Sequence, residues 1–176
     1  MWRLAATGEN VIWRSANNAT QIPVTRVSSL WSVAGIGDFD ADGKSGLLWR
    51  HATTRPNVMW RSANSAQQLP ATGVTNLAWK VVGIGDFDND GASDVLWRNT
   101  GNGVNAIWRS ANAATQITVT AVTNQAWKVV GVGDFDGDGK SDILWRHGTS
   151  GQNVMWAQGN YAMQQQVTGV VVASAK

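Results

Sequence analysis

The sequence contains no cysteine and few charged residues, which make up 15% of the chain. Without cysteine, the protein can form neither a disulfide scaffold nor a thiolate metal site. No apolar run approaches the ~18 residues that a transmembrane helix needs, and the opening Met-Trp-Arg-Leu-Ala is not a signal peptide. The formal net charge is only +2, and the 14 basic residues are scattered along the chain. We therefore expect neither membrane insertion nor nucleic-acid binding.

Tyrosine and phenylalanine are also scarce, with 1 and 3 residues, whereas tryptophan occurs 11 times. The chain has 176 residues, and 43% of them are hydrophobic, which is enough to bury a core. Its composition is not that of a disordered protein. This length suits one domain or one array of small units.

Short motifs return every 48 residues along the chain. Gly-Asp-Phe-Asp begins at 37, 85 and 133, and Leu-Trp-Arg begins at 48, 96 and 144. A Trp-Arg-Ser-Ala-Asn run occupies 13–17, 60–64 and 108–112, with the first copy one residue out of register, and its last copy reads Trp-Ala-Gln-Gly-Asn from 156. The repetition divides the chain into a partial unit, 1–32, and three full units, 33–80, 81–128 and 129–176.

Each full unit reads as four short strands rich in Val, Ile and Trp and separated by Gly, Asn and Asp. In the unit 81–128 the expected strands are Val81–Phe87, Asp94–Arg98, Asn105–Ser110 and about Gln116–Val122. No stretch has a convincing helical period. A repeat of about 40–50 residues with four strands is typical of a β-propeller blade, whereas the coils of a β-solenoid are usually shorter. The sequence predicts an all-β propeller array of three full four-stranded blades and a partial one.

The acidic residues gather in three loops, and Glu9 is the one exception among the 12. The loops follow the pattern D-x-D-x-D-G-x-x-D, which lets carboxylate oxygens converge on a hard cation such as Ca²⁺. The expected metal ligands are Asp86, Asp88, Asp90 and Asp94, then Asp134, Asp136, Asp138 and Asp142, and finally Asp38, Asp40 and Asp42. Loop 38–46 has Gly46 in place of the fourth acid and is expected to bind calcium weakly or not at all. The alternative is an Asx turn that binds nothing.

Tryptophan, arginine and asparagine recur together in every unit, on and beside the second and third expected strands. An indole ring matches the C–H face of a sugar, and Arg and Asn suit its hydroxyl groups. The candidate carbohydrate-binding residues are Trp49, Arg50, Asn57, Trp60, Arg61, Trp97, Arg98, Asn105, Trp108, Arg109, Trp145, Arg146, Asn153 and Trp156. Structural alternatives stay open: Trp as core between blades, Asn as a turn residue, and Arg in a salt bridge to a loop carboxylate.

The segment 130–146, Val-Gly-Val-Gly-Asp-Phe-Asp-Gly-Asp-Gly-Lys-Ser-Asp-Ile-Leu-Trp-Arg, resembles the FG-GAP/VCBS-type repeat. That repeat builds integrin-like seven-bladed propellers and related bacterial and fungal lectins. The resemblance covers the three full units and, without its loop, the partial one. It implies that the acidic loop joins the innermost strand to the second strand. It also implies that the carboxylates of loops 86–94 and 134–142 correspond to metal ligands.

Repeating one aromatic and polar constellation in each blade favours multivalent binding. We therefore expect a lectin that holds glycans or monosaccharides at its blade junctions. Two other functions stay open: an integrin-like adhesion or protein-interaction module, and an engineered propeller fragment that assembles into a ring. We expect no enzymatic activity, because the carboxylates cluster as metal ligands do and no nucleophile–base pair is present.

A closed propeller needs about four to eight blades, which is more than this array supplies. We expect a homo-oligomer, with a head-to-tail dimer that closes the ring as the leading arrangement. A secreted or cell-surface location is also expected.

Overall fold

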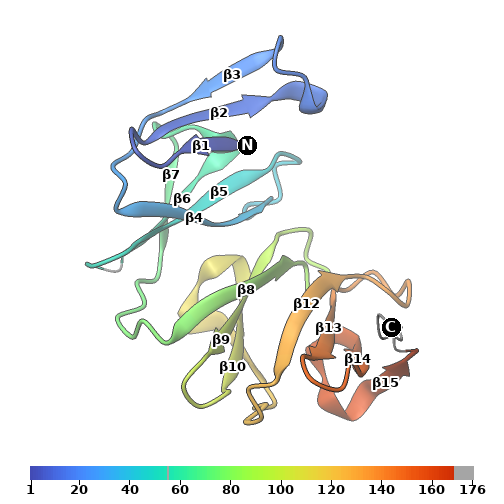
Figure 1. Ribbon diagram of the computed structural model, residues 1–176. Coiled ribbons are helices and arrows are strands. Elements are labelled where there is room, and N and C mark those ends of the chain that lie inside the picture. The colour runs from blue at the N-terminus through green and yellow to red at the C-terminus, as the bar shows by residue number, and fades with distance from the viewer. Residues whose placement is uncertain (55, 169–176) are drawn as a thin grey trace, which may run out of the picture. The chain divides into compact units, whose positions relative to one another are not determined.

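The structure is a computed structural model, and it describes residues 1–54 and 56–168. Four antiparallel sheets follow one another along the chain, and within each sheet the strands pair in chain order (Figure 1). The first sheet has three strands, β1 (Trp2–Leu4), β2 (Glu9–Trp13) and β3 (Gln21–Val24). The second has β4 (Trp31–Gly37), β5 (Gly46–His51), β6 (Asn57–Trp60) and β7 (Gln68–Ala71).

The third sheet repeats this arrangement with β8 (Trp79–Gly85), β9 (Asp94–Asn99), β10 (Asn105–Trp108) and β11 (Gln116–Val119). The fourth has β12 (Trp127–Gly133), β13 (Asp142–His147), β14 (Asn153–Trp156) and β15 (Gln164–Val167). The prediction of an all-β array of four-stranded blades with a 48-residue repeat is confirmed. Residues 169–176, the end of the last repeat unit, lie outside the described residues.

Strand ends differ slightly from those expected in the third sheet. The innermost strand runs over Trp79–Gly85 rather than Val81–Phe87, and a bulge lies between Val81 and Gly83. The third strand ends at Trp108, two residues early, because Ser110 (φ 45°) and Ala111 (φ 59°) have left-handed backbone. An extended strand cannot continue through that conformation. A short 3₁₀ turn, Arg109–Ala111, makes the corner instead.

The sheets fall into two compact units, residues Met1–Thr75 and Asn76–Lys176. Each unit contains two sheets and its own core. In the first unit the buried core is Val24, Leu47, Trp49 and Trp60. In the second it is Phe87, Leu96, Ile107, Val119, Ile143, Trp145, Val154 and Trp156. Both cores draw on two successive sheets, so the sheets bury their faces against each other as propeller blades do.

Glycines of the innermost strand β8 let the next innermost strand, β12, approach closely (Figure 1). A Cβ atom at Gly83 would lie 2.4 Å from Val132 Cγ2, and one at Gly85 would lie 2.4 Å from Ser141 Oγ. The Ser141 N–H donates to the Asp86 carbonyl at 2.6 Å and so links the two blades. The Val-Val-Gly-Ile-Gly motif therefore serves close packing between the inner strands. None of the helices in the described residues has the length and apolar character to cross a membrane.

Candidate functional site

A cleft of about 560 Å³ opens beside the fourth sheet in the second unit. Three indole rings and one phenol line it, together with several side-chain amides. The Trp145 and Trp156 rings lie 5.0 Å apart, and Tyr161 meets Trp156 edge-on at 5.3 Å. The lining residues from the fourth sheet and its connections are Trp127, Trp145, Gln152, Val154, Trp156, Tyr161, Gln164 and Gln166, and the rest of the wall is the segment Thr120–Asn124.

A smaller cleft, of about 170 Å³, lies in the first unit. Its lining residues are Val27, Trp31, Trp49, Val58, Trp60 and Gln68. In the repeat these are the positions of Val122, Trp127, Trp145, Val154, Trp156 and Gln164, all of which line the larger cleft. The Trp49 and Trp60 rings again lie 5.0 Å apart, tilted by 52° against 50° for the Trp145 and Trp156 pair. The same cleft is therefore built in both units.

Strand pairing explains which side chains reach the larger cleft. Trp145 of β13 lies opposite Val154 of β14, and Trp156 lies two residues further along that strand. Residues two apart in a strand share a face, so Val154 and Trp156 join Trp145 on one side of the sheet. The half-buried Trp127 comes from the start of β12, where its ring meets His147 at 5.1 Å.

Arg98, one of the predicted sugar ligands, lies at the base of the junction and is only 2% exposed. Its Nη1 donates to Asn105 Oδ1 at 3.0 Å, and its Nη2 donates to the Val122 carbonyl at 2.8 Å. The guanidinium carbon stands 5.1 Å from the centre of the Trp145 ring, within cation–π range. Burial lowers the pKa of Arg98, although a guanidinium stays charged at neutral pH. This side chain thus connects the third sheet to the fourth.

The same contacts recur in the first unit. Arg3 donates to Asn10 Oδ1 and to the Ser28 carbonyl, both at 2.8 Å, and lies 5.2 Å from the Trp49 ring. Arg50 donates to the Val74 carbonyl at 3.4 Å. The sequence left open a salt bridge from this arginine position to a carboxylate of the acidic loops. Among the described residues the salt bridges come instead from a different position, that of Arg61 and Arg109.

The predicted asparagine ligands are buried as well. Asn57 Nδ2 donates to the Thr72 carbonyl at 2.6 Å, and Asn105 Nδ2 donates to the Thr120 carbonyl at 2.8 Å. Asn153 accepts from Arg146 Nη1 at 3.2 Å. The structure thus brings Trp49, Trp60, Trp145 and Trp156 to the two clefts, and it buries Asn57, Arg98, Asn105 and Asn153 away from the cleft linings. Trp97 and Trp108 form the equivalent ring pair of the third sheet, 5.0 Å apart.

Sequence reasoning did not assign several residues that line the clefts. Trp31 and Trp127 occupy one register of the 48-residue repeat, as do Gln68 and Gln164. The 48-residue period was the sequence signal from which these positions could have been predicted as part of the site. Tyr161 belongs to the last copy alone, where the repeat has decayed, and no sequence pattern pointed to it.

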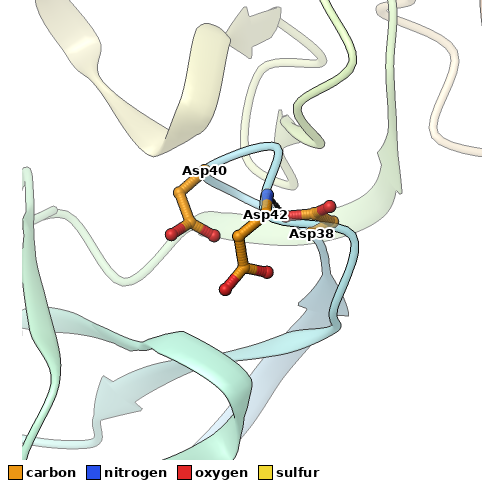
Figure 2. A group of neighbouring side chains, drawn as sticks. All are labelled: Asp38, Asp40 and Asp42. Atoms are coloured by element: carbon orange, nitrogen blue, oxygen red, sulfur yellow. Dashed lines mark hydrogen bonds between the residues drawn. The ribbon is translucent and has the colours of Figure 1, made fainter.

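The acidic loops form three candidate cation sites within the described residues. In each loop three carboxylates offer oxygen atoms within 4.8 Å of one another. The sets are Asp38, Asp40 and Asp42, then Asp86, Asp88 and Asp90, and finally Asp134, Asp136 and Asp142. Figure 2 shows the first set, in which Asp38 accepts a hydrogen bond from the Asp42 N–H at 3.1 Å. A donor set made only of carboxylate oxygens fits Ca²⁺.

Hydrogen bonds from backbone N–H groups act to lower the pKa of a carboxylate in these loops, whereas repulsion between the carboxylates acts to raise it. Burial tends to raise the pKa of Asp38, but the N–H groups of Gly43 and Asp42 outweigh it, so this pKa is lowered. The pKa of Asp136 is raised, first by desolvation and then by the charges of its acidic neighbours. A cation between like charges relieves such repulsion.

Residues 86–145 match the family described as FG-GAP-like repeat. This segment is therefore similar to an FG-GAP-like repeat. The match runs from the acidic loop of the third sheet to Trp145 of the fourth, and the 48-residue repetition carries the motif into the second sheet. FG-GAP-like repeats indicate a β-propeller protein-interaction module, and they often bind calcium, whereas the ligand has to be argued from the site. No curated protein and no solved structure matches the chain.

The fourth acid of the FG-GAP-like loops is a structural group. Asp94 is fully buried, and its oxygens accept the N–H of Phe87 at 2.9 Å and of Ser110 at 3.0 Å. Burial raises its pKa to about 6. Asp142 makes the same pair of bonds, from Phe135 at 2.8 Å and Gln158 at 2.9 Å. These two carboxylates therefore hold the left-handed corner after the third strand.

The second sheet differs at this position because it has glycine. A Cβ atom on Gly46 would lie 2.7 Å from the Trp60 carbonyl oxygen, so the backbone has closed over the space that a side chain would occupy. The Asp-to-Gly difference therefore removes a support of the corner as well as a carboxylate.

We expect Asp94→Ala to lower the free energy of unfolding by about 2–3 kcal/mol, because two buried N–H groups lose their acceptor. Chemical denaturation followed by circular dichroism measures the change. The matched control is Asp90→Ala in the same loop, an exposed residue that accepts one bond from Ala92 N. Equal stabilities for the two variants would contradict the structural role of Asp94.

Proposed function

We propose that the protein binds carbohydrate in the clefts between successive blades. The observation that carries this proposal is the recurrence of one cleft in both units, lined by the same six repeat positions. Three of those positions are tryptophan and one is glutamine. Selection for core packing alone would not require an open cleft at the same place in both units.

The chemistry of the lining suits a sugar. The half-buried Trp127 offers an indole surface to the C–H groups of a pyranose ring, whereas Trp145 and Trp156, 1% and 5% exposed, form the buried floor of the cleft. The side-chain amides of Gln152 and Gln164 can donate hydrogen bonds to sugar hydroxyl groups and accept hydrogen bonds from them. The larger cleft also falls within the volume of about 300–1,000 Å³ that is usual for small-ligand sites. Its volume of about 560 Å³, against about 170 Å³ for the cleft in the first unit, leaves room for a larger glycan.

Weak individual sites fit this arrangement. An affinity between millimolar and micromolar corresponds to about −4 to −8 kcal/mol per site. Several such sites on one array raise the overall avidity without new contacts. We expect Arg98 and Arg3, which lie over the cleft residues Trp145 and Trp49, to support the clefts rather than contact the ligand. Calcium in the acidic loops, a ring closed by a second copy and a secreted or cell-surface location stay predictions.

A glycan array is the first test, because discrete monosaccharide or disaccharide hits support the lectin and a blank array favours a protein-interaction module. The best hit is then titrated against tryptophan fluorescence. We expect Trp127→Ala to weaken binding at the larger cleft by about 10- to 100-fold, or about 1.4–2.8 kcal/mol. Trp127 is half-buried, so the fold should survive.

The matched control is Gln165→Ala, which changes an exposed residue beside Gln164 on the opposite face of β15. Its binding should equal that of the unchanged protein. An affinity of Trp127→Ala equal to that of the control would contradict the cleft as the sugar site.

A further inference from the structure

The second aspartate of the acidic loop has a different neighbour in the last blade. Asp40 forms an ion pair with Arg61 Nε, and Asp88 forms one with Arg109 Nε at 2.8 Å. The same repeat position in the fourth sheet holds Ala157. Within the described part of the chain, no basic side chain forms an ion pair with Asp136.

The difference lies in the side chain and not in the backbone that carries it. Arg61, Arg109 and Ala157 each begin the 3₁₀ turn after the third strand. The residues that follow them have nearly the same left-handed φ, 46° at Ser62, 45° at Ser110 and 53° at Gln158. The corner therefore presents a guanidinium to the acidic loop in the second and third sheets and a methyl group in the fourth.

The guanidinium and a metal ion would compete for one carboxylate. The Asp88 side chain is only 17% exposed, and its Oδ1 is buried without a hydrogen-bond partner among the described residues. Its other oxygen, Oδ2, already faces Arg109. A divalent cation held by Asp86, Asp88 and Asp90 would have to share or displace this ion pair, at a cost in electrostatic attraction.

Loop 134–142 has a neutral neighbour instead. Gln158 Nε2 donates to Asp138 Oδ2 at 2.6 Å, and this amide brings no charge to the cluster. Lys140 Nζ donates to Gln158 Oε1 at 3.5 Å. The backbone N–H of Lys140 and the amide of Gln158 lower the pKa of Asp138, and the positive charge of Lys140 helps to lower it, so the basic group near this loop is an ammonium that faces Asp138 rather than Asp136. The carboxylates of Asp134, Asp136 and Asp142 thus converge without a guanidinium among them.

We infer that Arg61 and Arg109 are internal counter-ions that take the place of a divalent cation at loops 38–46 and 86–94. The second and third sheets then keep their loops folded without metal, whereas the carboxylate cluster of loop 134–142 has no such guanidinium partner among the described residues. The sequence predicted calcium equally at loops 86–94 and 134–142, and this inference separates the two.

Calorimetric titration of the metal-stripped, full-length protein with CaCl₂ tests the inference. The unchanged protein should bind at most one Ca²⁺. Arg61→Ala and Arg109→Ala should each raise the number of bound ions by one, and the double variant should raise it by two. The matched control is Arg14→Ala, which removes the same arginine from the first sheet, where the chain has no acidic loop. It should leave the number unchanged.

Thermal unfolding gives a second readout that does not depend on counting sites. In a chelator, Arg109→Ala should melt at least roughly 4 °C below the unchanged protein, and millimolar Ca²⁺ should restore it. Arg109→Gln, which keeps most of the side-chain length without the charge, should behave as Arg109→Ala does. Three equal calcium sites in the unchanged protein, or arginine variants that gain no calcium, would overturn the inference.

Discussion

Trp145→Ala is expected to lower the free energy of unfolding by about 3–5 kcal/mol, the usual cost of truncating a fully buried tryptophan. Trp145 is 1% exposed and belongs to the core of the second unit. It contacts Trp156 within the fourth sheet and lies beneath the Arg98 guanidinium of the third. Removing the ring would leave a cavity between two blades and expose a buried charge to it.

Trp145→Phe is the matched control for this loss. The Trp145 indole N–H is buried and has no hydrogen-bond partner in the described part of the chain, so phenylalanine removes ring area and no hydrogen bond. We expect a smaller cost, about 1–2 kcal/mol. Denaturant unfolding of both variants, followed by circular dichroism, makes the comparison. Losses of the same size in the two variants would show that packing of the ring is not the source of its contribution.

Arg98→Ala should destabilise the second unit by about 3 kcal/mol, because the side chain is buried and its hydrogen bonds carry charge. Its loss leaves Asn105 Oδ1 and the Val122 carbonyl without their donor. Arg98→Lys should not restore the stability, since an ammonium group cannot reach two acceptors in the planar geometry of a guanidinium.

Arg146→Ala is the comparison for Arg98→Ala. Arg146 occupies the same repeat position, but it is only half-buried, and among the described residues it donates to Asn153. We expect a loss of about 1 kcal/mol or less. If denaturation gave Arg146→Ala and Arg98→Ala the same stability, the contact with the next blade would contribute nothing.

The amino-acid order alone determined the architecture of this protein. The Val-, Ile- and Trp-rich segments, which form strands of three to seven residues, and the Gly and Asp residues at the turns are local signals, so they specified sheets and loops without knowledge of their neighbours. The period of 48 residues showed that this unit repeats along the chain. The acidic loops were recognisable for the same reason, because their carboxylates lie within nine residues of one another.

Only the tertiary structure decided which repeated side chains face a cleft and which support it. Arg98 and Trp127 both recur in the sequence, but the Val122 carbonyl that accepts from Arg98 Nη2 lies 24 residues away, on the segment that leads to the next blade. The sequence also did not predict the ion pair between an acidic loop and its arginine. Asp88 and Arg109 lie 21 residues apart and come together only when the strands pair. A repeat pattern shows that a residue recurs, whereas its role depends on the packing of one blade against the next.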